Sequence, residues 1–188
     1  MKSIREIFRI GYGPSSSHTM GPRKAAELFL AAHPNAARYQ AHLYGSLSAT
    51  GKGHLTDAAI IDVIPSVEIV WHEEFLPFHP NGMRFCAWDT QDNLLDDWTV
   101  YSVGGGALAE ENQEPGTKNK DSLLSTLNSQ LSTDIYPLTR LSEIKDYCEK
   151  MGWDYWEYVE HYEGKEIWDY LREVWQVMRE AVERGLEH

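Results

Sequence analysis

The sequence predicts an α+β protein, a two-layer sandwich in which helices pack on a mixed or antiparallel sheet, extended by a long C-terminal helix. Two observations predict it. Periodic segments follow in the order helix, strand, helix, several strands and then helices, which also fits a mixed α/β sandwich. Residues 153–185 carry an apolar stripe at helical spacing and four of the seven tryptophans of the chain.

Composition limits the partners of the chain. Of its 188 residues, 42% are hydrophobic and 24% charged, as in ordinary globular proteins. The net charge of -12 argues against nucleic acid and anionic membranes as partners, since both require a basic surface. No segment approaches the roughly 20 apolar residues of a membrane helix. The first ten residues are charged and amphipathic, unlike a signal peptide. We expect a soluble, cytoplasmic protein.

The first half of the chain predicts two helices and a strand. A helix is expected over residues 22–32, where apolar residues recur along one helical face. Residues 37–47 alternate polar and apolar side chains, which is typical of a strand. A loop with two glycines, residues 48–54, then leads into a second helix at residues 56–64.

The middle of the chain predicts strands. Two strand-like runs, residues 66–80 and 82–90, are joined at His79-Pro80-Asn81-Gly82. Residues 93–109 indicate a strand pair or a bent strand, ended by three glycines. Residues 110–120 are polar and aperiodic, and indicate a mobile loop.

The C-terminal part is helical. Residues 141–152 predict an amphipathic helix with a serine cap and a glycine stop. A long helix should fill residues 153–185, and its apolar stripe requires a partner, either a second copy or another domain. The stripe consists of Ile167, Leu171, Val174, Trp175, Met178 and Val182. Residues 186–188 resemble a junction before a purification tag, so we expect a chain cut on purpose. The predicted division is 1–152, 153–185 and 186–188.

The first motif is a run of small polar residues before the first helix. It contains Ser15, Ser16, Ser17, His18 and Thr19. In the simplest interpretation Ser17 or Thr19 caps that helix, worth about 1 kcal/mol. In the functional interpretation, hydroxyls and N–H groups at a helix N-terminus bind a carboxylate or phosphate. His18 adds a group that titrates near neutral pH.

The second motif, "LYGSLSATGKGHLTD", follows a strand and precedes a helix, where α/β folds place ligands. Gly51 and Gly53 allow close approach of a ligand, and His54 lies at the start of the next helix. It is neither a Walker A nor a GxGxxG loop. The alternative is a tight turn with a surface histidine.

Two further loops carry weaker signals. Asn81-Gly82 is typical of a β-hairpin turn, although His79 and Asn81 can also face a pocket. The glycine run of "YSVGGG" indicates a bulge or bend.

In this order, "SSSHTMGP", "LYGSLSATGKGHLTD", "HPNGMRF" and "YSVGGG" resemble the N-terminal β portion of iron–sulfur-dependent bacterial L-serine dehydratases. The resemblance spans about residues 4–109 and continues more loosely through the terminal helix. It implies an enzyme that deaminates L-serine to pyruvate and ammonia without pyridoxal phosphate. It also implies a [4Fe–4S] cluster, held by cysteines of the α portion, whose open iron polarises the serine hydroxyl as a Lewis acid. The β portion is similar to the substrate-sensing domain of some phosphoglycerate dehydrogenases.

The cysteines depart from a complete enzyme. Cys86 and Cys148 are too few and too far apart to hold a cluster. The resemblance therefore implies that the ligands lie outside this chain, and that L-serine, the α portion and a second copy in a homodimer are its partners.

The resemblance also assigns roles to individual residues. His54 is expected to act as general base or acid, or to orient the substrate, because an imidazole suits proton transfer near neutral pH. The carboxylate of L-serine is expected to bind at Ser15, Ser16, Ser17, His18 and Thr19. Lys52 is a candidate to neutralise that carboxylate. Pocket walls are assigned to Gly51, Gly53, Asn81 and Gly82.

Two other interpretations stay open at this point. One is a non-catalytic amino-acid-binding regulatory module, favoured by the missing cysteine set. The other is a structural dimerisation domain, which leaves the two histidines at the helix starts unexplained.

Overall fold

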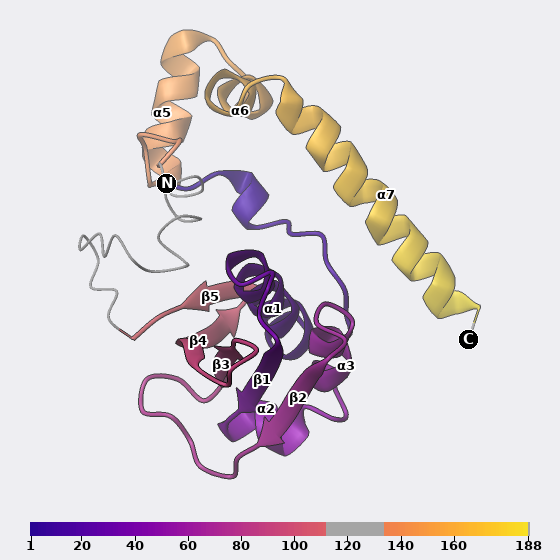
Figure 1. Cartoon of the computed structure of the whole chain (residues 1–188). Helices are drawn as coiled ribbons and strands as arrows, with labels where there is room; N and C mark the ends of the chain where they lie inside the picture. The colour runs from indigo at the N-terminus through magenta and orange to yellow at the C-terminus, as the bar shows by residue number, and fades with distance from the viewer. Residues whose placement is uncertain (112–133, 188) are drawn as a thin grey trace. The chain divides into compact units, whose positions relative to one another are not determined.

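The computed structural model describes residues 1–111 and 134–187 (Figure 1). The chain divides into two compact units. The strand unit comprises Gly11–Asn128, and the helical unit joins Met1–Ile10 to Ser129–His188. The predicted division after residue 152 is a functional one, and it stays a prediction.

Five strands form one mixed sheet in the order β2-β1-β3-β4-β5. They are β1 (Arg38–Leu43), β2 (Val67–Trp71), β3 (Gly82–Trp88), β4 (Leu94–Gly104) and β5 (Ala107–Ala109). Only the β1–β2 pair is parallel, and the other neighbours are antiparallel. The α+β prediction with a mixed sheet is confirmed.

Helices cover the sheet of the strand unit. They are α1 (Gly21–Ala32), α2 (Gly45–Thr50) and α3 (Thr56–Ile61), and a π-helical turn, η2 (Ser16–Met20), leads directly into α1. Figure 1 shows α1 beside the sheet, where it packs against β3, β4 and β5, while α3 packs against α1 and β2. The predicted helix at residues 22–32 is therefore confirmed as α1.

The core lies between α1 and the sheet. Along β1, Tyr39, Ala41 and Leu43 are buried and alternate with half-buried residues, as expected for a strand with one face on the core. Phe29 of α1 is fully buried, with its ring stacked 6.2 Å from that of Trp98 on β4.

In the described part of the helical unit, the chain forms a short 3₁₀ turn, η1, and three α-helices. These are η1 (Ile4–Glu6), α5 (Leu141–Met151), α6 (Tyr155–Glu163) and α7 (Glu166–Leu186). Tyr136, Cys148 and Tyr158 form its buried core. The carboxylate of Glu163 ties the N-terminal segment to this core, because it accepts hydrogen bonds from Ser3 Oγ at 2.7 Å and from the Ile4 N–H at 2.8 Å.

The strand predicted over residues 37–47 ends early. Gly45 takes a left-handed φ of +54°, and a Cβ there would lie 2.5 Å from the carbonyl oxygen of Pro80. The chain therefore turns at this glycine. Residues 45–50 form α2, including the first three residues of the predicted loop.

The hairpin predicted at Asn81-Gly82 is wrong, because β2 and β3 are not paired with each other. Both strands pair with β1, which lies between them. The hairpins lie later, first between β3 and β4 and then between β4 and β5, which both pair antiparallel. There Gly104, Gly105 and Gly106 all have positive φ, which confirms the predicted strand pair with its glycine run.

Two details of the C-terminal prediction change. The helix predicted at residues 141–152 is confirmed as α5 with Gly152 as its left-handed stop, but Ser142 lies inside the helix and does not cap it. The segment predicted as one long helix contains two, because Gly164 with φ +79° separates α6 from α7. The long helix itself is confirmed as α7, with 21 residues.

Residues 112–120 of the predicted loop lie outside the described part of the chain. None of the helices in residues 1–111 and 134–187 combines the length and the apolar character that a bilayer crossing requires.

Candidate functional site

The fold brings the first two sequence motifs together. The imidazole rings of His18 and His54 lie 4.7 Å apart between centroids, tilted by 36°. Both residues are half-buried. Thirty-five residues separate them in the sequence, and the contact joins the π-helical turn before α1 to the loop between α2 and α3.

The π-helical turn displaces the helix cap. Ser15 is the N-cap, and its hydroxyl accepts a hydrogen bond from the His18 N–H at 3.1 Å. A cap by Ser17 or Thr19, the simplest interpretation of the sequence, is therefore wrong, since both residues lie within the turn. Such π-helical turns are rare and occur frequently at functional sites. Ser16 is exposed at the start of this turn.

The ring of His18 is held at both nitrogens. Its Nδ1 lies 2.9 Å from Ser17 Oγ, and its Nε2 lies 3.0 Å from Ser46 Oγ. Burial lowers the pKa of His18, and the nearby His54 ring lowers it further. The imidazole is therefore neutral at neutral pH, and it exchanges hydrogen bonds with the two hydroxyls instead of presenting a positive charge.

His54 has a defined neutral tautomer. Its Nδ1 lies 3.0 Å from the carbonyl oxygen of Thr50, which only accepts hydrogen bonds. The proton of the neutral ring is therefore on Nδ1, and Nε2 keeps a lone pair. A histidine held in this way can take up a proton at Nε2.

Two buried threonines link the segments that carry the histidines. Thr19 Oγ1 donates to the carbonyl oxygen of His54 at 2.8 Å, and Thr56 Oγ1 donates to that of His18 at 2.6 Å. Each bond runs from one motif to the other, so the backbone positions of the two histidines depend on one another.

Three candidates in the second motif differ in their surroundings. Lys52 is exposed, and its ammonium lies 5.4 Å from the centre of the Trp71 ring. Gly53 is also exposed, and a Cβ there would meet nothing closer than 3.5 Å. Gly51, by contrast, is buried, and a Cβ there would lie 2.0 Å from the Leu47 carbonyl oxygen. Close packing requires a glycine at Gly51 but not at Gly53.

Asn81 connects strands instead of joining the histidine pair. Its side-chain N–H donates to the carbonyl oxygen of Ser102 at 3.2 Å, and its own carbonyl accepts from the Ser102 N–H at 3.0 Å. The side chain of His79 accepts from the Asn81 N–H at 3.1 Å. This loop touches the site through Pro80, whose carbonyl oxygen accepts from the Ser46 N–H at 2.9 Å.

Ser46 and Thr56 are the residues that the sequence prediction missed. Both stand in the second motif, but a serine or threonine near a helix start has an ordinary capping role. Their contacts with His18 span 28 and 38 residues, and no local pattern reveals such contacts.

The described residues do not fit an iron–sulfur cluster. Cys86 and Cys148 are buried free thiols that belong to different compact units. Within residues 1–111 and 134–187, no three His, Cys, Asp or Glu side chains come together to hold a metal ion. Clusters of this kind require several thiolates at one place, so these two cysteines do not form a ligand set.

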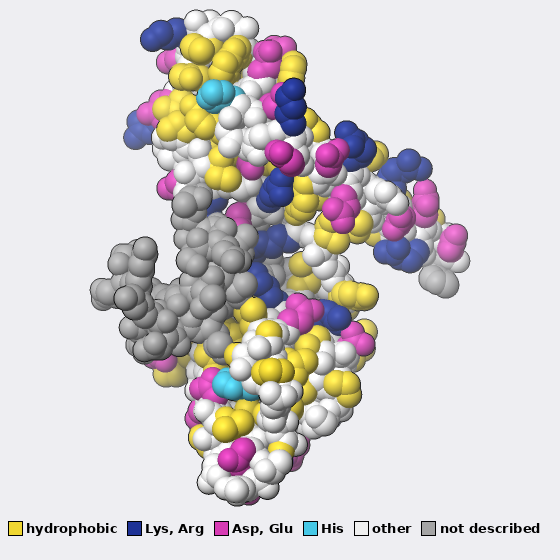
Figure 2. Space-filling model, turned by 45° about the horizontal axis from the view of Figure 1, so that its top comes forward, with side chains coloured by type: hydrophobic (Ala, Val, Ile, Leu, Met, Phe, Trp, Pro, Cys, Tyr) yellow, Lys and Arg dark blue, Asp and Glu magenta, His cyan; other side chains and the backbone are white. Residues whose placement is uncertain are grey.

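Charged side chains of both signs lie along the long helix α7. The chain has 29 acidic and 17 basic residues. On the face drawn in Figure 2, acidic and basic side chains are interspersed along α7. This is the pattern of a solvated helix with local ion pairs, such as Arg179–Glu183 at 3.5 Å.

Comparison with known proteins identifies relatives of the chain. The family described as serine dehydratase beta chain matches residues 3–68 and 61–113. L-serine dehydratase TdcG of Escherichia coli (strain K12) is 33% identical, over 99% of this chain and 49% of the relative. L-serine dehydratase 1 of the same organism is 31% identical, over 99% of this chain and 49% of the relative. L-serine dehydratase of Haemophilus influenzae is 28% identical, over 99% of this chain and 50% of the relative.

The chain spans about half the length of the curated relatives it matches. The family match covers more than half of the chain and includes the whole histidine pair with its supporting residues. By sequence, this chain belongs to the serine dehydratase beta chain family.

Proposed function

We propose that the chain is the β portion of an L-serine dehydratase, which converts L-serine to pyruvate and ammonia. The observation that carries the proposal is the contact between His18 and His54, 4.7 Å apart, in a chain related to L-serine dehydratases throughout its length. The contact joins two of the four motifs whose order produced the resemblance.

In this proposal His54 moves the proton. Its Nε2 takes the α-proton of L-serine, the C–O bond at the β-carbon breaks with its electron pair going to the hydroxyl oxygen, and Nε2 gives the proton to this oxygen, which departs as water. The resulting aminoacrylate tautomerises and is hydrolysed by water to pyruvate and ammonia. The bond from Nδ1 to the Thr50 carbonyl keeps the lone pair on Nε2 before the transfer. It also stabilises the ring once Nε2 carries the proton.

The substrate carboxylate binds at the π-helical turn. Ser16 is exposed there. The first N–H groups of a helical turn have no acceptor within the turn, so at this turn they are donors for an anion. We assign the Ser17 hydroxyl to the carboxylate as well, and the neutral His18 ring orients it through Nδ1, 2.9 Å from Ser17 Oγ. Ser15 and Thr19 support the turn, because one caps it and the other holds it to His54. Lys52, Gly53 and Asn81 stay predicted binding residues without such a contact.

We propose that the complete enzyme is independent of pyridoxal phosphate and carries a [4Fe–4S] cluster whose ligands lie outside this chain. The two buried cysteines support the second part, because neither has partners that would make a ligand set in the described residues. Free thiols also support a reducing compartment, and we place the enzyme in the cytoplasm.

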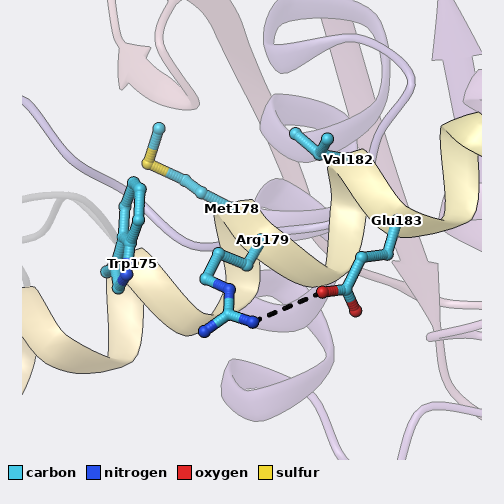
Figure 3. A pocket seen from close by; sticks show the side chains of 5 residues that line it. All are labelled: Trp175, Met178, Arg179, Val182 and Glu183. Atoms are coloured by element: carbon cyan, nitrogen blue, oxygen red, sulfur yellow. Dashed lines mark ion pairs between the residues drawn. The ribbon is translucent and has the colours of Figure 1, made fainter.

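The α portion supplies the partner surface for α7. Trp175, Met178 and Val182 are 60%, 50% and 61% exposed on one face of this helix. They line a groove that Arg179 and Glu183 border (Figure 3). The relatives are about twice as long as this chain and align through its whole length, so the other half of the same polypeptide is the occupant that we propose.

A double substitution tests this docking surface. Trp175→Glu with Met178→Glu should weaken binding of the separately produced α portion at least 10-fold in ultracentrifugation. Glu173→Gln, on the opposite side of the helix, is the matched control and should bind normally. Self-association of the isolated chain that the same double substitution abolishes would assign the face to a homodimer and contradict the α-portion assignment.

An assay of L-serine dehydration tests the proposed function. The polypeptide that joins this chain to the α portion should form pyruvate from L-serine and hold a stoichiometric cluster. The isolated chain, reconstituted with iron and sulfide without oxygen, should do neither. A stoichiometric cluster on the isolated chain would contradict the assignment of the ligands. L-serine binding by the isolated chain, without turnover by the complete polypeptide, would identify a regulatory module.

A further inference from the structure

We propose that Ser46 is a positioning residue that holds the His18 ring from the side opposite Ser17. This inference rests on the proposed function, since it assigns Ser46 to the carboxylate-binding side of that site. Ser46 Oγ lies 3.0 Å from His18 Nε2, and Ser17 Oγ lies 2.9 Å from Nδ1. A ring with a hydroxyl at each nitrogen cannot rotate without losing a bond. Ser46 therefore fixes the plane in which His18 orients the Ser17 hydroxyl.

The position of Ser46 is set by the connection between β2 and β3. Its N–H donates to the Pro80 carbonyl oxygen at 2.9 Å, and the Gly45 N–H donates to that of Glu74 at 2.9 Å. Gly45 must be a glycine, because its φ is +54° and a Cβ would lie 2.5 Å from the Pro80 oxygen. Ser46 is thus held independently of the segment that carries His18.

Helix α2 holds the other histidine as well. Thr50 lies one turn after Ser46 on this helix, and its hydroxyl donates to the Ser46 carbonyl oxygen at 2.9 Å. The Thr50 carbonyl oxygen in turn accepts from His54 Nδ1 at 3.0 Å. One short helix therefore provides a hydrogen-bond partner to each of the two rings, whose centroids lie 4.7 Å apart.

For the enzyme, loss of the Ser46 hydroxyl is expected to affect substrate binding and not turnover. Removal of the Ser46 hydroxyl frees His18 at Nε2 but leaves the Thr50–His54 contact intact, since that contact uses a backbone carbonyl. Ser46→Ala should therefore raise KM for L-serine about 10-fold and leave kcat within about 2-fold, because misplacement of a positioning group weakens substrate alignment. Ser46→Thr keeps a hydroxyl at the same atom and should restore KM.

Imidazole ¹⁵N NMR of the isolated 188-residue chain tests the contact without any activity. Ser46→Ala should change the ring nitrogen shifts and the pKa of His18. The ring nitrogen shifts of His54 should stay close to wild type. Ser48→Ala, two residues along the same helix, is the matched control and should change neither ring. Backbone amide spectra of each variant report whether the fold is retained. Should Ser46→Ala unfold, Ser46→Thr is measured instead: it keeps the hydroxyl, and the ring nitrogen shifts of His18 should then stay close to wild type.

The outcomes separate the two proposals. Unchanged His18 shifts in Ser46→Ala would overturn the positioning role, whatever the enzyme does. Changed shifts with an unchanged KM in the complete enzyme would overturn its part in binding L-serine. A complete polypeptide without L-serine dehydratase activity would contradict the proposed function, and the NMR measurement would still decide whether Ser46 holds His18.

Discussion

The strand unit and the helical unit both hold polar groups away from water, but they use different partners. In the strand unit the hydroxyls of Thr19 and Thr56 bond to backbone carbonyls of the two histidines, so the histidine rings stay available for other contacts. In the helical unit one carboxylate, Glu163, accepts from the hydroxyls of Ser3 and Tyr136 and from the Ile4 N–H.

The difference in hydrogen-bond partners distinguishes a reactive site from a contact that only holds the structure together. A site that moves protons needs groups whose partners change, and neutral hydroxyls around an imidazole provide them. A charged carboxylate with several donors forms strong bonds that hold a chain segment in place. The strand unit is therefore the place to look for chemistry, and the helical unit the place to look for assembly.

The largest effect is expected from His54. His54→Ala in the complete enzyme should lower kcat by about 10²–10⁴, the usual loss of a general acid or base. His18→Ala should act mainly on KM, because its proposed work is to orient hydroxyls at the carboxylate. Steady-state kinetics with L-serine measures both.

Two controls sharpen this contrast. His161→Gln, in the helical unit, should leave kcat and KM near wild type. Iron content should be unchanged in His54→Ala, since the histidine is not proposed as a cluster ligand. Turnover of His54→Ala near the wild-type rate would remove the catalytic role.

The next effect is on the stability of the strand unit. Phe29 is fully buried against Phe85 and Trp98, with ring centroids 5.5 Å and 6.2 Å away. Phe29→Ala should lower the free energy of unfolding by about 3–5 kcal/mol, because it removes a large buried ring and leaves a cavity. Urea unfolding followed by tryptophan fluorescence measures the loss.

Phe75→Ala is the matched control, since Phe75 is 64% exposed. It should cost less than about 1 kcal/mol. Equal losses in the two variants would mean that Phe29 is not part of the central packing.

Local patterns predicted the elements that depend on local periodicity. The apolar residues on one face of α1 and the alternation along β1 follow from burial on one side, so both elements were found. The turn at Gly45 was missed, because the need for a glycine there comes from close packing on Pro80, which is distant in sequence. The β2–β3 hairpin was wrong for a similar reason, since β1 takes the place between them.

The site was found only in part for the same physical reason. His18 and His54 stand out because imidazoles beside helix starts are unusual features. Ser46 acts through contacts 28 residues away, and Pro80 acts through its carbonyl oxygen, which every residue possesses. Side-chain identity does not show which carbonyl accepts a bond, so these supports became visible only in the structure.

Loss of the hydrogen bonds to the Glu163 carboxylate in the helical unit is expected to have an intermediate effect on the free energy of unfolding. Glu163→Gln keeps the shape of the side chain but loses the charge that Ser3, Ile4 and Tyr136 face. We expect a loss of about 2 kcal/mol in the free energy of unfolding, the range of a hydrogen bond to a charged group. Faster exchange of the Ile4 amide in NMR should accompany it.

Tyr136 reports the same change spectroscopically. Burial raises the pKa of Tyr136, and the Glu163 carboxylate raises it further. In Glu163→Gln the pKa of Tyr136 should therefore fall, as measured by tyrosinate absorbance. Glu173→Gln, exposed on α7, is the control. An unchanged Ile4 amide in Glu163→Gln would show that the N-terminal segment is held by other contacts.

The smallest effect is a pH dependence of the strand unit. Burial lowers the pKa of both His18 and His42, and a second histidine beside each, His54 and His72, lowers it further. The unfolded chain keeps the ordinary histidine value of about 6.5. As the pH falls below this value, the unfolded state binds protons before the folded state does. The free energy of unfolding should therefore decrease, and above this value these two groups contribute no pH dependence.

Amide exchange measured between pH 7.5 and 5.5 checks this prediction unit by unit. Protection in β1, β3 and α1 should fall toward the acid end of this range. The double substitution His18→Gln with His42→Gln should flatten that fall, because it removes the groups that the unfolded state protonates first. A steeper fall in the double variant, or one confined to α5 and α6, would assign the acid sensitivity to other groups and break the contrast between the two units. A flattened profile would show that the neutral histidines of the strand unit, including the one that faces Ser46, are held in that state by the fold.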